Sequence, residues 1–243
     1  MASLAFLAHG WRARLAGVAH SALPQACALC AIASGTSLVC ADCARSLPPP
    51  GACCPACALP LVGGSRCGRC LAHPPVYDRT VAAFVYAFPL DELIQSYKYQ
   101  GMLACADWFA DAMFERRETH PDADVMVAMP LSRSRQRERG FNQSLEIAKP
   151  LARRLGIRLA AAAVTRERDT PPQASLPWRE RTANVRGAFA CHEDFAGRRV
   201  LVVDDVMTTG ASVDELAHTL KRAGACHVEN WLLARTLPPV GDA

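Results

Sequence analysis

The segment from Val200 to Ser212 carries the residue types best suited to chemistry in this chain. Four apolar residues predict a buried strand, and Asp204 and Asp205 follow at its carboxyl end, where open α/β sheets bind ligands. The polar turn after them opens a helix, whose free N–H groups and hydroxyls suit a monophosphate. The turn consists of Thr208, Thr209, Gly210, Ala211 and Ser212.

The two carboxylates can accept hydrogen bonds from a pair of vicinal hydroxyls. Hydroxyls held a short distance from a phosphate describe a ribose 5-phosphate, so we expect such a ligand at Asp204, Asp205 and the turn. The alternative is a generic strand that ends in acids beside an ordinary helix cap.

Eight of the twelve cysteines form an internal repeat. Two residues separate the cysteines of each pair, and nine residues separate the pairs. Such pairs let four thiolates complete the closed tetrahedral shell of a structural zinc ion, with no position left for catalysis. We therefore expect two zinc ions. Their ligands are Cys27, Cys30, Cys40 and Cys43 in the first unit and, each 27 residues later, Cys54, Cys57, Cys67 and Cys70 in the second.

A disulfide framework is the main alternative for these cysteines, and a redox pair or an iron–sulfur cluster is a lesser one. Disulfides require an oxidising compartment, and closed loops of two residues strain their geometry. The remaining cysteines are interpreted as buried small hydrophobes: Cys53, Cys105, Cys191 and Cys226.

Two polar segments are candidates for binding phosphate groups. Arginines alternate from Arg133 to Arg139, which indicates phosphate binding or, as an alternative, a solvated surface. A guanidinium such as that of Arg133 can pair with two phosphate oxygens. The long loop from Arg166 to Asn184 is typical of a lid, whose closure over a ligand excludes water.

Short apolar strands alternate with helices after residue 76, which predicts a parallel sheet covered on both faces. The expected strands are Thr80–Phe88, Val125–Met129, Ala161–Thr165, Gly187–Cys191, Arg199–Val203 and His227–Ala234. The expected helices lie between Pro89 and Arg117 and at Asn142–Leu155 and Ala211–Ala223, with Asn142 as an N-cap.

Composition divides the 243 residues into three parts. Residues 1–23 contain no acid, and an apolar stripe from Leu4 to Val18 predicts an amphipathic helix, with a leader of no structural role as the alternative. Residues 24–73 form the cysteine-rich module, and residues 76–243 form the α/β domain. The net charge of +4 is too small to indicate nucleic-acid binding. No apolar run reaches the roughly 18 residues of a membrane span, so we do not expect an integral membrane protein.

The segment from Val200 to Ser212 resembles the PRPP (5-phosphoribosyl-1-pyrophosphate) signature of type I phosphoribosyltransferases. The chain as a whole resembles the ComF/GntX family. This wider resemblance rests on the paired cysteines, Ile94-x3-Lys98-Tyr99-x-Gly101, Arg139–Gln143, Gln173, and Arg181-x2-Asn184-Val185-x-Gly187-Ala188-Phe189.

The resemblance implies a cytoplasmic bacterial protein with a type I phosphoribosyltransferase-like sheet and an N-terminal double zinc ribbon. It implies that Asp204 and Asp205 hold the ribose hydroxyls and that Mg²⁺ accompanies the pyrophosphate. It further implies that Leu131, Ser132 and Arg133 contact pyrophosphate, with Arg133, Asp204 and Asp205 as the catalytic candidates. A flexible loop would close over PRPP through Gln173, Arg181 and Asn184.

Two functions follow from the resemblance. One is a phosphoribosyltransferase, linked to DNA uptake in competence, that transfers the phosphoribosyl group to an unidentified nitrogen nucleophile. The other is a PRPP- or nucleotide-binding adaptor without catalysis, which contacts single-stranded DNA or competence proteins.

Overall fold

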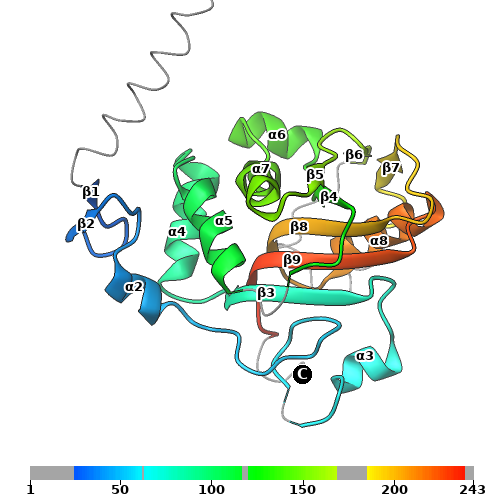
Figure 1. The fold of residues 1–243 in the computed structure, drawn as a ribbon, viewed down its shortest axis with the longest axis horizontal. Coiled ribbons are helices and arrows are strands. Elements are labelled where there is room, and N and C mark those ends of the chain that lie inside the picture. Colours follow the sequence, from blue (N-terminus) through cyan, green and yellow to red (C-terminus); the bar gives the residue numbers. More distant parts are fainter. Residues whose placement is uncertain (1–24, 62, 117–119, 169–184, 239–243) are drawn as a thin grey trace, which may run out of the picture. The chain divides into compact units, whose positions relative to one another are not determined.

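A computed structural model describes residues 25–61, 63–116, 120–168 and 185–238 (Figure 1). The chain divides into two compact units, residues 1–47 and residues 48–243, and the boundary falls between the two cysteine repeats. The expected helix at residues 1–23 and the expected lid residues Gln173, Arg181 and Asn184 lie outside the described residues. None of the described helices is long and apolar enough to cross a membrane.

The first unit contains the first cysteine repeat and three short elements. They are β1 (Gln25–Ala26), β2 (Ala33–Gly35) and α2 (Ala41–Ser46). Strands β1 and β2 pair antiparallel, and Cys40 caps α2, its sulfur accepting a hydrogen bond from the N–H of Cys43.

The second unit contains the second cysteine repeat and the main sheet. Its helices are α3 (Gly68–Ala72), α4 (Leu90–Tyr99), α5 (Cys105–Glu115), α6 (Arg133–Arg139), α7 (Gln143–Leu155) and α8 (Ala211–Arg222). Its strands are β3 (Arg79–Val85), β4 (Val125–Ala128), β5 (Arg158–Leu159), β6 (Val164–Arg166), β7 (Phe189–Cys191), β8 (Arg199–Met207) and β9 (His227–Arg235).

Five strands form a parallel sheet in the order β3-β9-β8-β4-β5, which confirms the expected fold class. Strands β6 and β7 pair antiparallel in a separate ribbon. The expected strand at Ala161–Thr165 corresponds to β6 and therefore lies outside the parallel sheet, where it joins β7 across the long loop.

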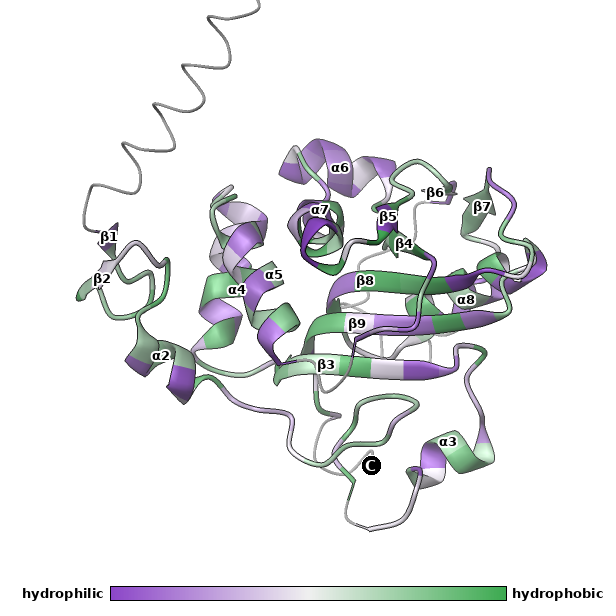
Figure 2. Ribbon diagram, viewed as in Figure 1, coloured by the Kyte–Doolittle hydropathy of each residue, from purple (hydrophilic) through white to green (hydrophobic). Residues whose placement is uncertain are grey.

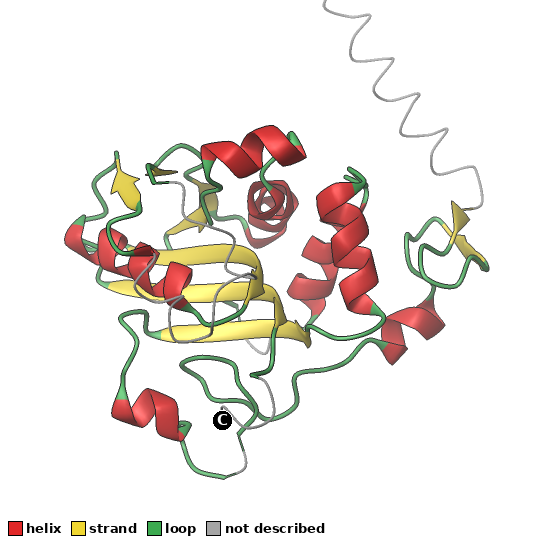
Figure 3. Cartoon of the chain, turned by 180° about the vertical axis from the view of Figure 1, so that it is seen from behind, coloured by secondary structure: helices red, strands yellow, loops and turns green. Residues whose placement is uncertain are grey.

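Apolar residues cover both faces of the sheet. Val125, Val127, Val200 and Val202 belong to one buried cluster with the apolar residues of α8. The alternate residues, such as Leu201, are also buried, and helices α5 and α7 pack against the sheet as well. Helix α8 lies behind the sheet in Figure 1 and in front of it in Figure 3. Burial on both faces explains why the strands are continuous apolar runs.

Helix α6 was not expected from the sequence. It forms because Ser132 caps its first turn, accepting a hydrogen bond from the N–H of Arg135, and because Gly140 ends it at a φ of +77°. Figure 2 shows α6 as mostly hydrophilic, which explains why no apolar periodicity revealed it. Helix α7 begins as expected at Asn142, whose side chain accepts a hydrogen bond from the N–H of Leu145.

Candidate functional site

Strand β8 is longer than its apolar run. It pairs with β4 only as far as Val203, but it continues beside β9 as far as Met207, opposite Arg235. Asp204 and Asp205 therefore lie within the strand, beyond the end of β4. Both are buried, each with 8% of its surface exposed.

Fixed partners orient both carboxylates. Oδ1 of Asp204 accepts hydrogen bonds from Oγ of Ser144, at 2.8 Å, and from the N–H of Asp205, at 2.9 Å. Oδ1 of Asp205 accepts from the N–H of Val206 at 2.6 Å, and its Oδ2 lies 2.9 Å from Nζ of Lys98. Each acid therefore keeps one defined orientation before a ligand arrives.

The electrostatic environment of Asp204 disfavours its ionised form. Burial, followed by the negative charge of Asp205, raises the pKa of Asp204 to about 7. The hydrogen bond from Ser144 and the charge of Lys98 act in the opposite direction. Asp204 therefore changes its charge near neutral pH, so it is either a hydrogen-bond donor or a pure acceptor depending on conditions.

The anion loop, residues Thr208–Ser212, joins β8 to α8. Gly210 has a φ of +87°, which glycine adopts without strain and other residues rarely adopt. Oγ1 of Thr209 accepts a hydrogen bond from the N–H of Ala211 at 3.3 Å, at the start of α8. The loop therefore presents hydroxyls and the amino end of a helix together, the combination that binds phosphate groups.

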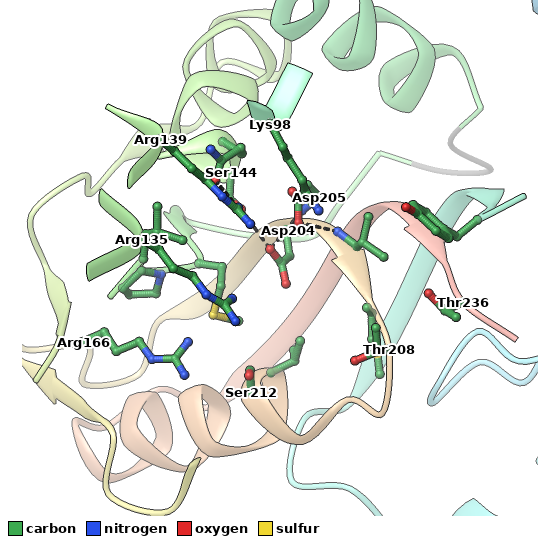
Figure 4. Close-up of a pocket in the computed structure, with 18 of the residues that line it drawn as sticks. Lys98, Arg135, Arg139, Ser144, Arg166, Asp204, Asp205, Thr208, Ser212 and Thr236 are labelled. Atoms are coloured by element: carbon green, nitrogen blue, oxygen red, sulfur yellow. Dashed lines mark hydrogen bonds and ion pairs between the residues drawn. The ribbon is translucent and has the colours of Figure 1, made fainter. Parts of the chain in front are cut away.

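A cavity of about 540 Å³ opens between the two acids and the anion loop. Four cations line it: Lys98, Arg135, Arg139 and Arg166. In Figure 4, Arg135 and Arg166 extend into the cavity from the side opposite Thr208, and Ser212 lies between Thr208 and the arginines. The cavity is thus bordered by carboxylates, by the anion loop and by guanidinium groups.

Two of these arginines, Arg135 and Arg139, lie on helix α6, and they differ in whether other side chains hold them. Arg139 is held in place: its Nη1 donates to Oε1 of Gln143 at 2.9 Å, and its guanidinium lies 5.2 Å from the ring centre of Tyr99. The side chain of Arg135 has no hydrogen-bonded partner among the described residues and is available to a ligand.

The structure brings together most of the site expected from the sequence. Six of the expected residues line the cavity: Leu131, Asp204, Asp205, Thr208, Gly210 and Ser212. Thr209 and Ala211 belong to the same loop but do not line it. Ser132 caps α6 instead, and Arg133 lines a smaller neighbouring cavity of about 210 Å³.

Residues that the sequence reasoning did not assign to the site also line the cavity. Four of them lie in the stretches on which the family resemblance rests, so that resemblance could have pointed to them: Lys98, Tyr99, Arg139 and Gln143. No sequence pattern pointed to Ser144 and Tyr86, because only the tertiary structure places them at the cavity.

Each cysteine repeat forms a compact tetrad, with its sulfur atoms all within 4.8 Å of one another. Two sulfurs bound to one tetrahedral zinc at about 2.3 Å lie about 3.8 Å apart. The Sγ atoms of Cys30 and Cys40 are 3.8 Å apart, and those of Cys57 and Cys67 are 3.6 Å apart. The two tetrads therefore fit two structural zinc ions.

Backbone N–H groups already favour one thiolate in each tetrad. Burial raises the pKa of Cys27, but backbone hydrogen bonds from Cys40, Cys30 and Leu29 outweigh it and lower the value to about 6. Cys54 shows the same balance, with a pKa of about 7. Zinc is bound by thiolates, so these groups are prepared for the metal.

The cysteines outside the tetrads only partly match the expectation of burial. Cys105 is buried, and Cys53 and Cys191 are half-buried. Cys226 is exposed, which corrects the expectation: its thiol donates to the carbonyl oxygens of Gly197 and Arg198, so backbone groups just before β8, and not the core, hold it.

Comparisons with known proteins agree with both parts of the chain. The phosphoribosyl transferase domain family matches residues 142–236, and the double zinc ribbon domain family matches residues 18–71. DNA utilization protein YhgH of Escherichia coli (strain K12) is 38% identical over 224 residues, which cover 88% of this chain and 99% of that protein.

Two further relatives are named for competence. Competence protein F of Haemophilus influenzae is 33% identical over 181 residues, which are 70% of this chain and 78% of that protein. Competence protein ComFC of Streptococcus pneumoniae is 26% identical over 154 residues, which are 63% of this chain and 67% of that protein. With a phosphoribosyltransferase-like sheet, a double zinc ribbon and these relatives, the chain belongs to the ComF/GntX family.

Proposed function

We propose that this protein binds PRPP together with Mg²⁺ and transfers its phosphoribosyl group to a nitrogen nucleophile. One observation carries the proposal: a single cavity is bordered by a carboxylate pair, an anion loop and several guanidinium groups. These are the three kinds of partner that ribose hydroxyls, a 5′-phosphate and a pyrophosphate require.

Asp204 and Asp205 would accept hydrogen bonds from the 2′- and 3′-hydroxyls of the ribose. Their carboxylates are already oriented by Ser144 and Lys98, so little ordering is needed when the sugar arrives. The hydroxyls of Thr208 and Ser212 and the amino end of α8 would hold the 5′-phosphate.

The guanidinium groups of Arg135 and Arg166 would face the pyrophosphate, with Arg139 fixed beside them. Guanidinium pairs with phosphate oxygens at two points. Mg²⁺ would enter bound to the pyrophosphate oxygens, because this ion is usually held through substrate phosphates and few carboxylates.

In the transfer, the nitrogen lone pair forms a bond to C1 of the ribose while the bond from C1 to the pyrophosphate oxygen breaks. Pyrophosphate leaves with the bonding electrons, and the nitrogen then releases a proton to solvent. Positive charge develops on the sugar and negative charge on the leaving group, so the protein's contribution is mainly electrostatic. The carboxylates lie on the sugar side and the arginines on the leaving-group side.

Calorimetry with PRPP and Mg²⁺ tests binding, and pyrophosphate release over a panel of ammonia, amines and nucleobases tests transfer. The double variant Asp204→Asn/Asp205→Asn should lose PRPP binding and keep both zinc ions. Wild-type binding without pyrophosphate release for any acceptor would contradict the enzymatic part of the proposal.

A second candidate is an adaptor that binds PRPP or a nucleotide and contacts single-stranded DNA or competence proteins. The names of the relatives favour it, as do the exposed arginines on α6 that do not line the cavity, Arg133 and Arg137. The variant Arg133→Ala/Arg137→Ala separates the two candidates. It should weaken a gel shift of single-stranded DNA if the adaptor role holds, while leaving PRPP binding unchanged. In either role we propose a cytoplasmic protein, where reducing conditions keep the zinc-binding thiols available.

A further inference from the structure

The second cysteine tetrad is joined to the anion loop by two arginines. Arg235, at the end of β9, is 1% exposed and donates from Nε to the carbonyl oxygen of Cys57 at 2.8 Å. Its Nη1 donates to the carbonyl oxygen of Met207 at 2.8 Å and to that of Thr208. One buried guanidinium thus connects a metal-ligating residue to the start of the loop.

Arg69 makes the second connection. It lies on α3, between the tetrad residues Cys67 and Cys70, and its Nη2 donates to the carbonyl oxygen of Thr209 at 2.8 Å. Three successive carbonyl groups, of residues 207, 208 and 209, are therefore held by these two arginines.

Holding these carbonyls also fixes the direction of the N–H groups that follow them. In a planar trans peptide the C=O and the next N–H point in opposite directions. The N–H groups of Thr208, Thr209 and Gly210 must then point away from the arginines. Among the described residues, those of Thr209 and Gly210 donate no hydrogen bond, so they remain available to a ligand.

The rest of the second repeat is part of the same core. Ala58 belongs to the buried cluster beneath the sheet, and the carbonyl oxygen of Pro55 accepts a hydrogen bond from the N–H of Thr80 on β3 at 2.9 Å. After the repeat, the N–H of Val76 donates to Oδ1 of Asp214 on α8 at 2.7 Å. The repeat is therefore anchored to β3, and the segment that follows it is anchored to α8, the helix after the loop.

We propose that the second tetrad positions the anion loop for phosphate, with Arg235 and Arg69 as the positioning residues. Zinc fixes Cys57, Cys67 and Cys70, and the two arginines transmit that order to the loop carbonyls. Loss of this zinc, or of either arginine, loosens the loop and weakens binding of a 5′-phosphate. The inference rests on the proposed role of the loop as the phosphate site.

Arg69→Gln tests the connection because Arg69 is exposed, so the variant should fold, whereas Arg235 is buried. Arg66→Gln is the matched control, since it changes an exposed arginine of the same repeat that has no hydrogen bond to the loop among the described residues. We measure amide hydrogen exchange over residues 206–214 without ligand, and calorimetric affinity for ribose 5-phosphate and PRPP, all on the full chain with its zinc content determined.

Arg69→Gln should speed exchange over residues 206–214 and weaken both ligands about tenfold, the loss of one charged hydrogen bond, while Arg66→Gln matches the wild type. Equal exchange in the two variants would overturn the connection, whatever the ligand data show. Faster exchange in Arg69→Gln with no ligand binding by the wild type supports the connection and overturns the proposed PRPP site.

Discussion

Nζ of Lys98 lies 2.9 Å from Oδ2 of Asp205, so a half-buried cation from α4 neutralises the carboxylate pair on β8. The two residues are far apart in the sequence, and the sheet order places the end of α4 beside the end of β8. Because Asp204 and Asp205 are adjacent and buried, the lysine is needed for both to carry charge.

Lys98→Met should weaken PRPP binding about tenfold at pH 7, because without this cation the charge of Asp205 keeps Asp204 protonated and less able to accept a hydrogen bond from the ribose. Calorimetry at pH 7 and pH 9 measures the effect, which should shrink at the higher pH as Asp204 ionises. Lys149→Met is the control: its Nζ lies 2.6 Å from Oε1 of Glu146, but it does not line the cavity. Tighter binding in Lys98→Met would instead show that Lys98 obstructs the sugar.

Asp204→Asn should stabilise the protein at high pH. The folded-state pKa of Asp204 is about 7, raised by burial from an ordinary value of 3.8. Protonated Asp204 contributes fully to the free energy of unfolding below its ordinary pKa of 3.8. That contribution is lost as the pH rises through the folded-state pKa. Between pH 6 and pH 7 the advantage of the variant should grow by about 1 kcal/mol, and by roughly another 0.4 kcal/mol before it levels off near pH 8.

Urea unfolding curves from pH 6 to pH 9 measure this advantage. The exposed Asp194→Asn should give a constant difference over the same range. A constant difference for Asp204→Asn as well would contradict the raised pKa.

Arg135→Gln should weaken PRPP about tenfold but leave ribose 5-phosphate unchanged, because its guanidinium would face only the pyrophosphate. Arg137→Gln should change neither, since Arg137 is on the same helix but does not line the cavity. Calorimetry with both ligands decides the matter. Equal losses for both ligands in Arg135→Gln would place that arginine at the 5′-phosphate instead.

Gly210→Ala should abolish phosphate binding with little loss of fold. A Cβ at this position would lie 2.5 Å from Cε of Met207 and 3.2 Å from Oη of Tyr77, at a φ of +87°. Gly197→Ala is the control, because Gly197 also has a positive φ, of +68°, but a Cβ there meets nothing within 4 Å. Gly197→Ala should lose about 1 kcal/mol of unfolding free energy from its positive φ, and Gly210→Ala should lose more because Met207 must also move. Only Gly210→Ala should lose ribose 5-phosphate binding.

Ligand should protect one of the two zinc ions. Two ligands that bind at coupled sites raise each other's affinity by the same factor, so PRPP should tighten zinc binding in the second tetrad. With PRPP at about 100 times its Kd, zinc loss from the second tetrad to a chelator should slow by up to about 100-fold. The double variant Cys30→Ser/Cys43→Ser removes the zinc of the first tetrad. All the zinc that this variant releases then comes from the second tetrad, and its release should show the full slowing by PRPP. Equal protection of both ions in the wild type would contradict a connection specific to the second tetrad.

Much of the candidate site was predictable because its residues are contiguous in the sequence. A strand that runs directly into acids, hydroxyls and glycine puts them at one edge of the sheet whatever surrounds them. The cation side was less predictable. Arg133 was the natural choice after β4, but a helix begins there, so Arg135 and Arg139 line the cavity and Arg133 faces its smaller neighbour.

By itself, the sequence determined the two cysteine tetrads that fit zinc, the parallel sheet, and the strand, polar loop and helix that begin at Val200, because each depends on local spacing or periodicity. The tertiary structure alone decided which distant groups complete the site. Lys98, Ser144 and Arg235 reach β8 and its loop only through the strand order and the packing of the helices. It also decided that the second cysteine repeat packs with the sheet, since its contacts join residues more than 100 positions apart, and no local pattern records such pairs.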